Sequence, residues 1–341
     1  MLFEDILITI LKAVDGERTI SSPYHLIKGK KSGQTIQDIG YYKLHPYFGV
    51  MPKLEKKVYD KAVQKLFEQG FIITDGQVVR MTEASMALQT PVPLLNGWKY
   101  RGKEQLFMAR LSLIVQSLSQ IHQNQRAFDP VVIAEDIQQW VKKYLHRINY
   151  RDAESCRNFK TELAVSLSKV DVDAAGKRIV VQRLSGFKIG GLTWEQIAAA
   201  ERLEVIDIKL QAIETLHAWM DVLETRQFPM MSELLDGVIQ QSSLTETARR
   251  TEYYFRNGRS LEEIAALRGL KTSTIEDHFV ELAMNDPGFD ILAFMDGSLY
   301  SKIIAVSHSR NTKRLRDIKE AIPEAGYFQI RLALATKGET L

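Results

Sequence analysis

The sequence has very little cysteine: Cys156 is the only one among 341 residues. One thiol can form neither an internal disulfide nor a cysteine-based metal site, and such usage is typical of a reducing compartment. Long hydrophobic runs are missing too, so we expect no contact with a membrane. The first residues carry Glu4 and Asp5 where a secretory signal would carry lysine or arginine, and they predict a helix instead. We therefore expect a cytoplasmic protein.

Motifs of catalytic chemistry are missing as well. The chain has no His-Glu-x-x-His, no Gly-x-Ser-x-Gly, no Gly-x-Gly-x-x-Gly after a strand and no helicase motor motif. Residues 29–32 read Gly-Lys-Lys-Ser, but Lys31 interrupts the order of a phosphate-binding loop, and no glycine stands at the required place upstream. The seven histidines are scattered. We therefore expect no enzymatic activity, no cofactor and no metal ion.

Positive charge is scarce overall but concentrated near the N-terminus. The formal net charge is only +3 at pH 7, yet nine lysines stand against three acidic residues between Tyr24 and Lys65. Such clustering is what binding to nucleic-acid phosphates through counterion release requires. Exposed lysines are also ordinary on solvated helix faces. Contact with DNA or RNA and docking of a protein therefore both remain open for this segment.

Residues 24–82 predict a winged helix. Lys28, Lys30 and Lys31 form a basic loop with two glycines around it. An amphipathic helix is expected over about residues 53–69, because apolar residues recur there at helical spacing. Two β-prone runs, 71–74 and 77–82, are joined by Asp75-Gly76, a dipeptide that favours a type I′ hairpin. Helices followed by such a hairpin are typical of a winged helix.

Three short motifs follow one another in this segment. They are Leu-Ile-Lys-Gly at 26–29 with Ile36 after it, Asp-x-Gly-x-x-Lys-Leu at 38–44, and Tyr-Phe-Gly-Val at 47–50. This order resembles the winged-helix domain that follows the motor in RecQ-family DNA helicases, which binds duplex or forked DNA through its backbone. Some members separate base pairs with an aromatic residue at the wing tip; here the tip is Asp75-Gly76, so we expect no such pin. The resemblance implies DNA contacts from Lys28, Lys30, Lys31, Ser32, Gln34, Lys43, Lys56, Lys57 and Lys61.

A helix-turn-helix pattern occupies residues 260–282. Ser260 and Glu263 form a capping box, Gly269 permits a tight turn, and Thr272 or Ser273 is expected to cap the second helix. The start of that helix would meet the major groove if the unit reads DNA. DNA contact and protein docking remain equally open, because two of the expected exposed residues are acidic. These exposed residues are Lys271, Ser273, Thr274, Glu276 and Asp277, of which the first three are the expected DNA contacts.

The same segment carries Arg-Gly-Leu at 268–270, Ser-Thr-Ile at 273–275 and Asp-His at 277–278. These steps resemble the helix-turn-helix domain at the C-terminus of some RecQ helicases. Together, the two segments resemble the YpbB-like helix-turn-helix proteins that certain Gram-positive bacteria make alongside a short RecQ-type helicase. This resemblance implies an accessory protein that binds DNA and acts with such a helicase in repair, recombination or fork processing.

The sequence thus predicts a mainly α-helical chain with three domains. They are a winged helix with a small β-hairpin at 1–90, a helical middle domain at 99–240 and a helix-turn-helix domain at 243–341. The middle domain shows no chemistry, and spacing, homo-oligomer formation and partner binding all remain open for it; residues 178–184 there could form a strand or a loop. Two further functions also remain open: a stand-alone transcription regulator or replication-initiation factor, and a protein-binding adaptor.

Overall fold

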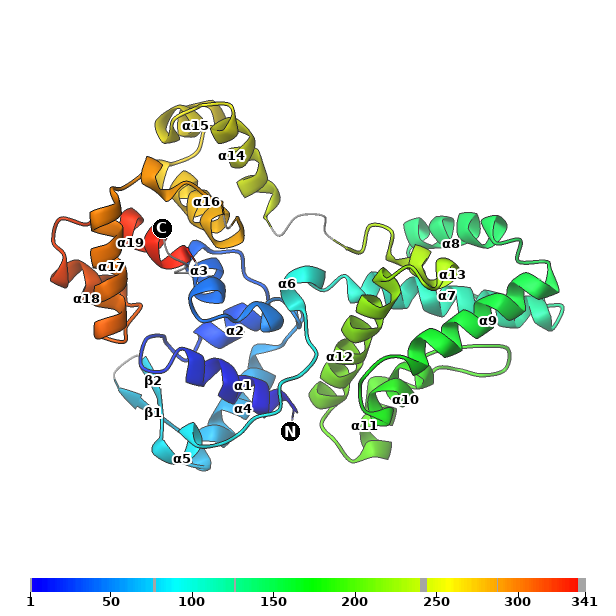
Figure 1. Cartoon of the computed structure of the whole chain (residues 1–341). Coiled ribbons are helices and arrows are strands. Elements are labelled where there is room, and N and C mark those ends of the chain that lie inside the picture. Colours follow the sequence, from blue (N-terminus) through cyan, green and yellow to red (C-terminus); the bar gives the residue numbers. More distant parts are fainter. Residues whose placement is uncertain (1, 76–77, 126, 240–243, 287, 337–341) are drawn as a thin grey trace. The chain divides into compact units, whose positions relative to one another are not determined.

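The computed structural model describes residues 2–75, 78–125, 127–239, 244–286 and 288–336. Over these residues the chain is mainly helical, as the sequence predicts, with a two-stranded antiparallel sheet near the N-terminus. It divides into two compact units (Figure 1). The first comprises Met1–Leu7, Gly49–Pro52 and Gln89–Gln240, and the second Ile8–Phe48, Lys53–Leu88 and Gln241–Leu341. Within the described ranges, none of the helices has the length and apolar character needed to cross a membrane.

The N-terminal segment folds as the expected winged helix. Its elements are α1 (Leu2–Ala13), α2 (Ser22–Ile27), α3 (Gly33–Tyr41), the 3-10 turn η1 (His45–Tyr47), α4 (Lys56–Glu68), β1 (Ile72–Asp75), β2 (Val78–Met81) and α5 (Glu83–Met86). Apolar side chains four residues apart are buried, two on α1 and one directly after it: Ile6, Ile10 and Val14. Helix α4 buries Tyr59 and Leu66, whereas Lys57 and Lys61 are exposed.

The hairpin is present, and its first strand extends one residue further than expected. Asp75 pairs with Val78 in the antiparallel register, so it is the last residue of β1 and not the first residue of the turn. Gly76 and Gln77 lie outside the described residues. Thr19 forms a bridge with Val78, and the Gly16 N–H donates to the Val79 carbonyl at 2.9 Å. The segment after α1 therefore lies along β2.

The motif residues at 26–50 are mostly core residues. Leu26, Leu44 and Phe48 are each at most 2% exposed. Asp38 is also buried, and its carboxylate forms an ion pair with Arg18 at 2.7 Å. These motifs therefore specify how the segment folds, whereas its polar surface comes from the residues between them.

The secondary-structure elements of the middle segment are all helices within the described residues. They are α6 (Gly97–Tyr100), α7 (Glu104–His122), α8 (Glu135–Arg147), α9 (Ala153–Ser168), α10 (Ala174–Gln182), α11 (Trp194–Glu201), α12 (Val205–Glu224), α13 (Pro229–Ser232) and η2 (Glu233–Leu235). Residues 178–184, for which the sequence allows a strand or a loop, belong mostly to helix α10. Trp219 of α12 is fully buried, and its indole N–H donates to Ser166 Oγ at 2.9 Å. Trp140 and Trp194 pack against the same core.

The C-terminal segment contains the expected helix-turn-helix. Its elements are α14 (Glu246–Arg256), α15 (Leu261–Arg268), α16 (Thr272–Asn285), η3 (Ile291–Ala293), α17 (Gly297–Ser309), α18 (Leu315–Ala321) and α19 (Tyr327–Ala335). Helix α16 packs against both α14 and α15 (Figure 1). Phe279 lies at the centre of an aromatic cluster, with its ring centroid 4.8 Å from that of Phe255 and 4.9 Å from that of Phe294.

Most of the N-terminal segment belongs to the same compact unit as the C-terminal segment, although the sequence suggests two separate domains for them. Helix α3 packs against both α16 and α19. The Tyr41 hydroxyl donates to the Arg331 carbonyl at 2.8 Å, and the Lys313 N–H donates to Glu17 Oε1 at 2.9 Å. Gly40 leaves room for Met284, whose Cε would lie 2.4 Å from an added Cβ. The domain boundaries drawn from the sequence remain a prediction, but this packing joins the first and third expected domains.

Candidate nucleic-acid interface

The basic loop, residues 28–32, connects α2 to α3. Gly29 has a φ of +73°, a left-handed conformation that glycine adopts without strain. Ser32 then caps α3, because its hydroxyl accepts the Thr35 N–H at 3.4 Å. Lys30 and Lys31 between them are exposed, and within the described part of the chain neither forms an ion pair with a carboxylate. Their ammonium groups are therefore available to an anion from solution.

The ring of Tyr24 brings two of the expected basic residues together. The ammonium nitrogens of Lys28 and Lys56 each lie 5.3 Å from its ring centroid. The neighbouring imidazole of His25 has a pKa below its usual value, because of burial first and then because of nearby positive charge. That charge comes from Lys30, Lys56 and Lys28. The loop and the start of α4 therefore create one region of positive potential.

The lysines of α4 are exposed but differ from those of the loop. Lys56 forms an ion pair with Asp60, and Lys57 lies 2.9 Å from Glu55. Lys61 is exposed on the next turn. Ion pairs of exposed side chains are weak, so a phosphate could replace the carboxylates. Even so, these carboxylates reduce the net positive charge of α4. We therefore expect the loop lysines to bind phosphate more strongly than the lysines of α4.

Other expected contacts are less well placed. The basic loop precedes α3, and Lys43 lies beyond the other end of this helix. Helix α3 has nine residues and spans about 12 Å at 1.5 Å per residue. The charge of Lys43 acts instead on Lys313, whose pKa is lowered by burial first and by Lys43 and Arg18 in addition. The Ser32 hydroxyl is already used as a helix cap. Gln34 is exposed on the first turn of α3 and remains available.

The helix-turn-helix forms as its sequence predicts, apart from the cap of its second helix. Ser260 and Glu263 make the reciprocal capping box, and Gly269 ends α15 with a φ of +60°. The expectation that Thr272 or Ser273 caps α16 is wrong. Lys271 has the extended backbone of the cap position, so the helix begins at Thr272 without a side-chain cap. Lys271 and Ser273 are exposed, and Thr274 is half-buried.

The acidic residues at 276 and 277 on α16 are half-buried. Glu276 and Asp277 were expected to be exposed, but Arg331 of α19 forms an ion pair with Asp277 and lies 3.9 Å from Glu276. The Asp277 carboxylate also sits against Gly33, where an added Cβ would be 2.6 Å from Oδ2. Sequence reasoning did not single out Arg331, because Asp277 lies 54 residues away from it and no local motif connects them.

Arg331 also reaches α3. When the Gln37 amide is oriented with its carbonyl toward the guanidinium, its oxygen accepts from Nε at 2.8 Å and from Nη2 at 2.7 Å. Only 15% of the Arg331 side chain is exposed. One arginine therefore links α19, α16 and α3, and it offsets the negative charge that would repel DNA from α16.

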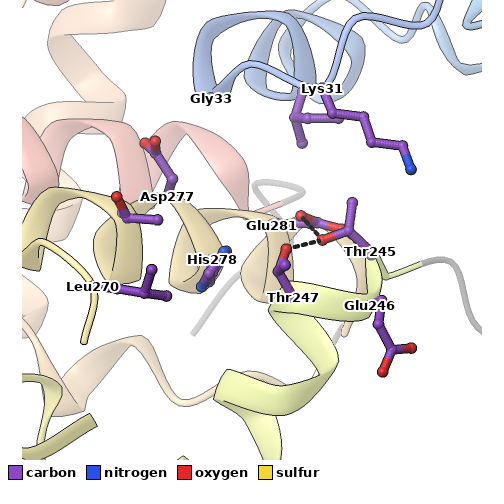
Figure 2. Close-up of a pocket in the computed structure, with 11 residues that line it drawn as sticks. Lys31, Gly33, Thr245, Glu246, Thr247, Leu270, Asp277, His278 and Glu281 are labelled. Atoms are coloured by element: carbon purple, nitrogen blue, oxygen red, sulfur yellow. Dashed lines mark hydrogen bonds between the residues drawn. The ribbon is translucent and has the colours of Figure 1, made fainter. Parts of the chain in front are cut away.

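A pocket of about 350 Å³ lies where the basic loop meets the helix-turn-helix. Lys31 lines it from the loop, Gly33 from the start of α3, and Thr274 from α16. Figure 2 shows Lys31 on the side opposite Thr245 and Glu281, with the Thr245 hydroxyl donating to Glu281 Oε2 at 2.9 Å. The structure thus brings together two segments that predict DNA binding separately.

His278 lines this pocket, where hydrogen bonds to neighbouring side chains give it a structural role. Its Nδ1 lies 2.8 Å from Thr251 Oγ1 and 3.4 Å from an Arg268 guanidinium nitrogen. Burial and the Arg268 charge lower the pKa of His278 to about 4, so the imidazole is neutral at pH 7. Among the described residues, no cluster of histidine, cysteine, aspartate and glutamate side chains could hold a metal ion.

The comparisons with known proteins agree with the class that this geometry defines. A family model described as a helix-turn-helix domain matches residues 247–334, and a domain of this class supports DNA binding. Nearly the whole chain is similar to Protein YpbB of Bacillus subtilis (strain 168). The two are 29% identical over 342 residues, which cover 97% of this chain and 96% of that protein. No solved structure matches the chain. The expected likeness to RecQ helicases remains a prediction.

Proposed function

We propose that this chain is a DNA-binding accessory protein without enzymatic activity, which acts with a RecQ-family helicase in DNA repair, recombination or fork processing. One observation supports this best: Lys31 of the basic loop and Thr274 of the second helix line the same pocket. Two segments with independent signs of DNA binding therefore offer one continuous surface to a single DNA molecule.

The pocket itself is lined by the carboxylates of Glu246, Asp277 and Glu281, so the charges that suit the backbone of duplex or forked DNA are those of the lysines around it. Lys30, Lys31 and Lys271 are all exposed. Lysine contacts with phosphates position a protein on DNA without reading its sequence. The start of α16 adds backbone N–H groups and the positive end of a helix dipole, both of which favour a phosphate. Asp277 on the same helix opposes this less than its charge suggests, because Arg331 pairs with it.

The helicase partner follows from the resemblance of both terminal segments to accessory domains of RecQ helicases. The sequence contains no helicase motor motif, so the motor would come from a second protein. Similarity to Protein YpbB along nearly the whole chain is compatible with this arrangement. A homo-oligomer formed through the middle domain remains a prediction.

Two alternatives make different predictions. A stand-alone transcription regulator or replication-initiation factor would prefer one duplex sequence, whereas a helicase accessory would prefer forks or junctions. A protein-binding adaptor would use both terminal segments for partners and would have no affinity for DNA. The exposed lysines without ion-pair partners in the described basic loop favour the DNA-binding proposals over the adaptor.

The first test is fluorescence anisotropy of a labelled fork at about 50 and about 200 mM salt. Changing Lys28, Lys30 and Lys31 together to alanine should weaken binding strongly. If each contacts one phosphate, the slope of log affinity against log salt should fall in magnitude by about 2.7. The matched control changes Lys142, Lys143 and Lys160, three exposed lysines of the middle segment, and should bind like the wild type. Equal effects of the two triple changes would contradict the interface.

The second test addresses the partner. A tagged chain is purified under native conditions from cells that make it, and co-purifying proteins are identified by mass spectrometry. Recovery of a RecQ-type helicase supports the proposal, as does faster fork unwinding by that helicase when the chain is added. If no helicase is recovered and unwinding is unchanged, the accessory role is refuted. DNA binding is then judged by the first test alone.

A further inference from the structure

One face of α14 carries two arginines and two tyrosines around a shallow depression of about 430 Å³. The lining residues are Arg249, Arg250, Tyr253 and Tyr254. They form two overlapping pairs spaced four residues apart, 249 with 253 and 250 with 254. Residues at this spacing lie on the same side of a helix, so the four side chains form one surface. Helix α14 precedes the helix-turn-helix pattern, and the expected DNA contacts do not include it.

Tyr253 exposes most of its ring to solvent. The residue is 67% exposed, although an aromatic ring of this size gains from burial. Tyr254 beside it is half-buried, and the two rings meet nearly edge to face, with centroids 5.6 Å apart and planes at 74°. The Tyr254 ring therefore supports that of Tyr253 from one side, while much of the Tyr253 ring is left open to a planar ligand.

The charges around this ring are predominantly positive. Arg249 and Arg250 both pair with the single carboxylate of Glu246. Arg268 of α15 is close enough that the charge of Arg250 lowers its pKa, second to the effect of burial. Within the described residues Arg268 has only uncharged hydrogen-bond partners, among them the Thr247 carbonyl at 2.8 Å. Arg249 and Arg250 thus share one carboxylate, Arg268 adds a third positive charge near Arg250, and the surface attracts an anion.

We propose that this α14 face binds single-stranded DNA, with a base stacked on Tyr253 and the adjacent phosphates held by Arg249 and Arg250. The choice of DNA as the partner rests on the function proposed above. An exposed ring next to surplus arginine charge is the arrangement that single-strand-binding proteins use, since every base has a face that can stack. A paired base in a duplex hides both faces from such a ring. The α14 face would therefore take the unpaired strand of a fork.

The test measures anisotropy of a labelled oligothymidine of about ten nucleotides, within the usual range of site sizes. Tyr253→Ala should weaken its binding about ten-fold or more, which corresponds to the loss of one stacked base. Tyr253→Phe should bind like the wild type, because stacking needs the ring and not the hydroxyl. Arg249→Ala with Arg250→Ala should weaken binding and reduce its salt dependence. Tyr327→Ala is the matched control, since Tyr327 of α19 is 52% exposed and lies outside this face.

The outcomes separate this inference from the proposed function. Duplex binding that depends on the loop lysines, together with oligothymidine binding that depends on Tyr253, supports both. Duplex binding without oligothymidine binding, or oligothymidine binding that Tyr253→Ala leaves unchanged, overturns the inference alone. If the protein binds neither duplex DNA nor the oligothymidine, both this inference and the proposed DNA-binding function are overturned. Tyr253→Ala could also reduce the recovery of a protein partner and leave oligothymidine binding intact. That result would assign the α14 face to the protein partner and overturn the inference.

Discussion

Replacement of Arg331 by methionine should loosen the attachment of α3 to the helix-turn-helix. In the wild type the guanidinium pairs with Asp277 and donates two hydrogen bonds to the Gln37 carbonyl. Methionine keeps much of the side-chain volume but removes the charge and every donor. The Asp277 carboxylate then remains beside α3 without its partner, and the Gln37 carbonyl loses its two donors.

The expected cost can be bounded from the exposure of the two side chains. Removing one partner of a fully buried ion pair costs about 3–5 kcal/mol. Here 15% of the Arg331 side chain and 38% of the Asp277 side chain are exposed, so water can solvate the carboxylate that remains. We therefore expect a loss of about 2 kcal/mol. For a unit of about 150–250 residues this corresponds to a fall in Tm of roughly 4–8 °C.

Calorimetry measures the Tm, and hydrogen exchange of the α3 backbone amides shows where the loss occurs. The control is Arg316→Met on α18, which removes an exposed pair with Glu320 at 2.8 Å and should cost no more than about 0.5 kcal/mol. Exchange along α3 should accelerate only in the Arg331 variant. If the two variants have the same Tm and the same α3 exchange, then Arg331 does not join the two segments and this reasoning is wrong.

Three further predictions concern single buried or partly buried groups. Asp38→Asn should lower the free energy of unfolding by about 3 kcal/mol, because it leaves Arg18 without its buried counter-charge; urea unfolding measures this, and a loss below about 1 kcal/mol would contradict it. The pKa of His25, followed by NMR, should rise on addition of duplex DNA, because phosphates offset the lysine charges that help to lower it. Binding should therefore tighten as the pH falls below 7, and an unchanged His25 pKa would place the DNA elsewhere. Ser166→Ala should cost about 1–3 kcal/mol by leaving the Trp219 N–H buried and unpaired; a neutral effect on unfolding, monitored by tryptophan fluorescence, would refute this.

The local elements of both terminal segments could be predicted from the sequence. Ser260, Glu263 and Gly269 fix the ends of α15 because caps and tight turns depend on residues only a few positions apart. The hairpin was predictable for the same reason, although the register that makes Asp75 a strand residue was not. Lys271 occupies the cap position of α16 although threonine has the stronger local preference for it, so the preference of one residue does not by itself fix a helix end.

Only the tertiary structure decided how these elements combine into a surface. Arg331 and Asp277 lie 54 residues apart in the chain, and Tyr41 meets the Arg331 carbonyl across 290 residues. Such contacts depend on which faces pack together, and no periodicity or motif within one segment specifies that choice. The same packing holds Asp277 against α3 and places Lys31 beside Thr274. The sequence by itself determined which side chains could meet DNA, and long-range packing determined which of them share one site.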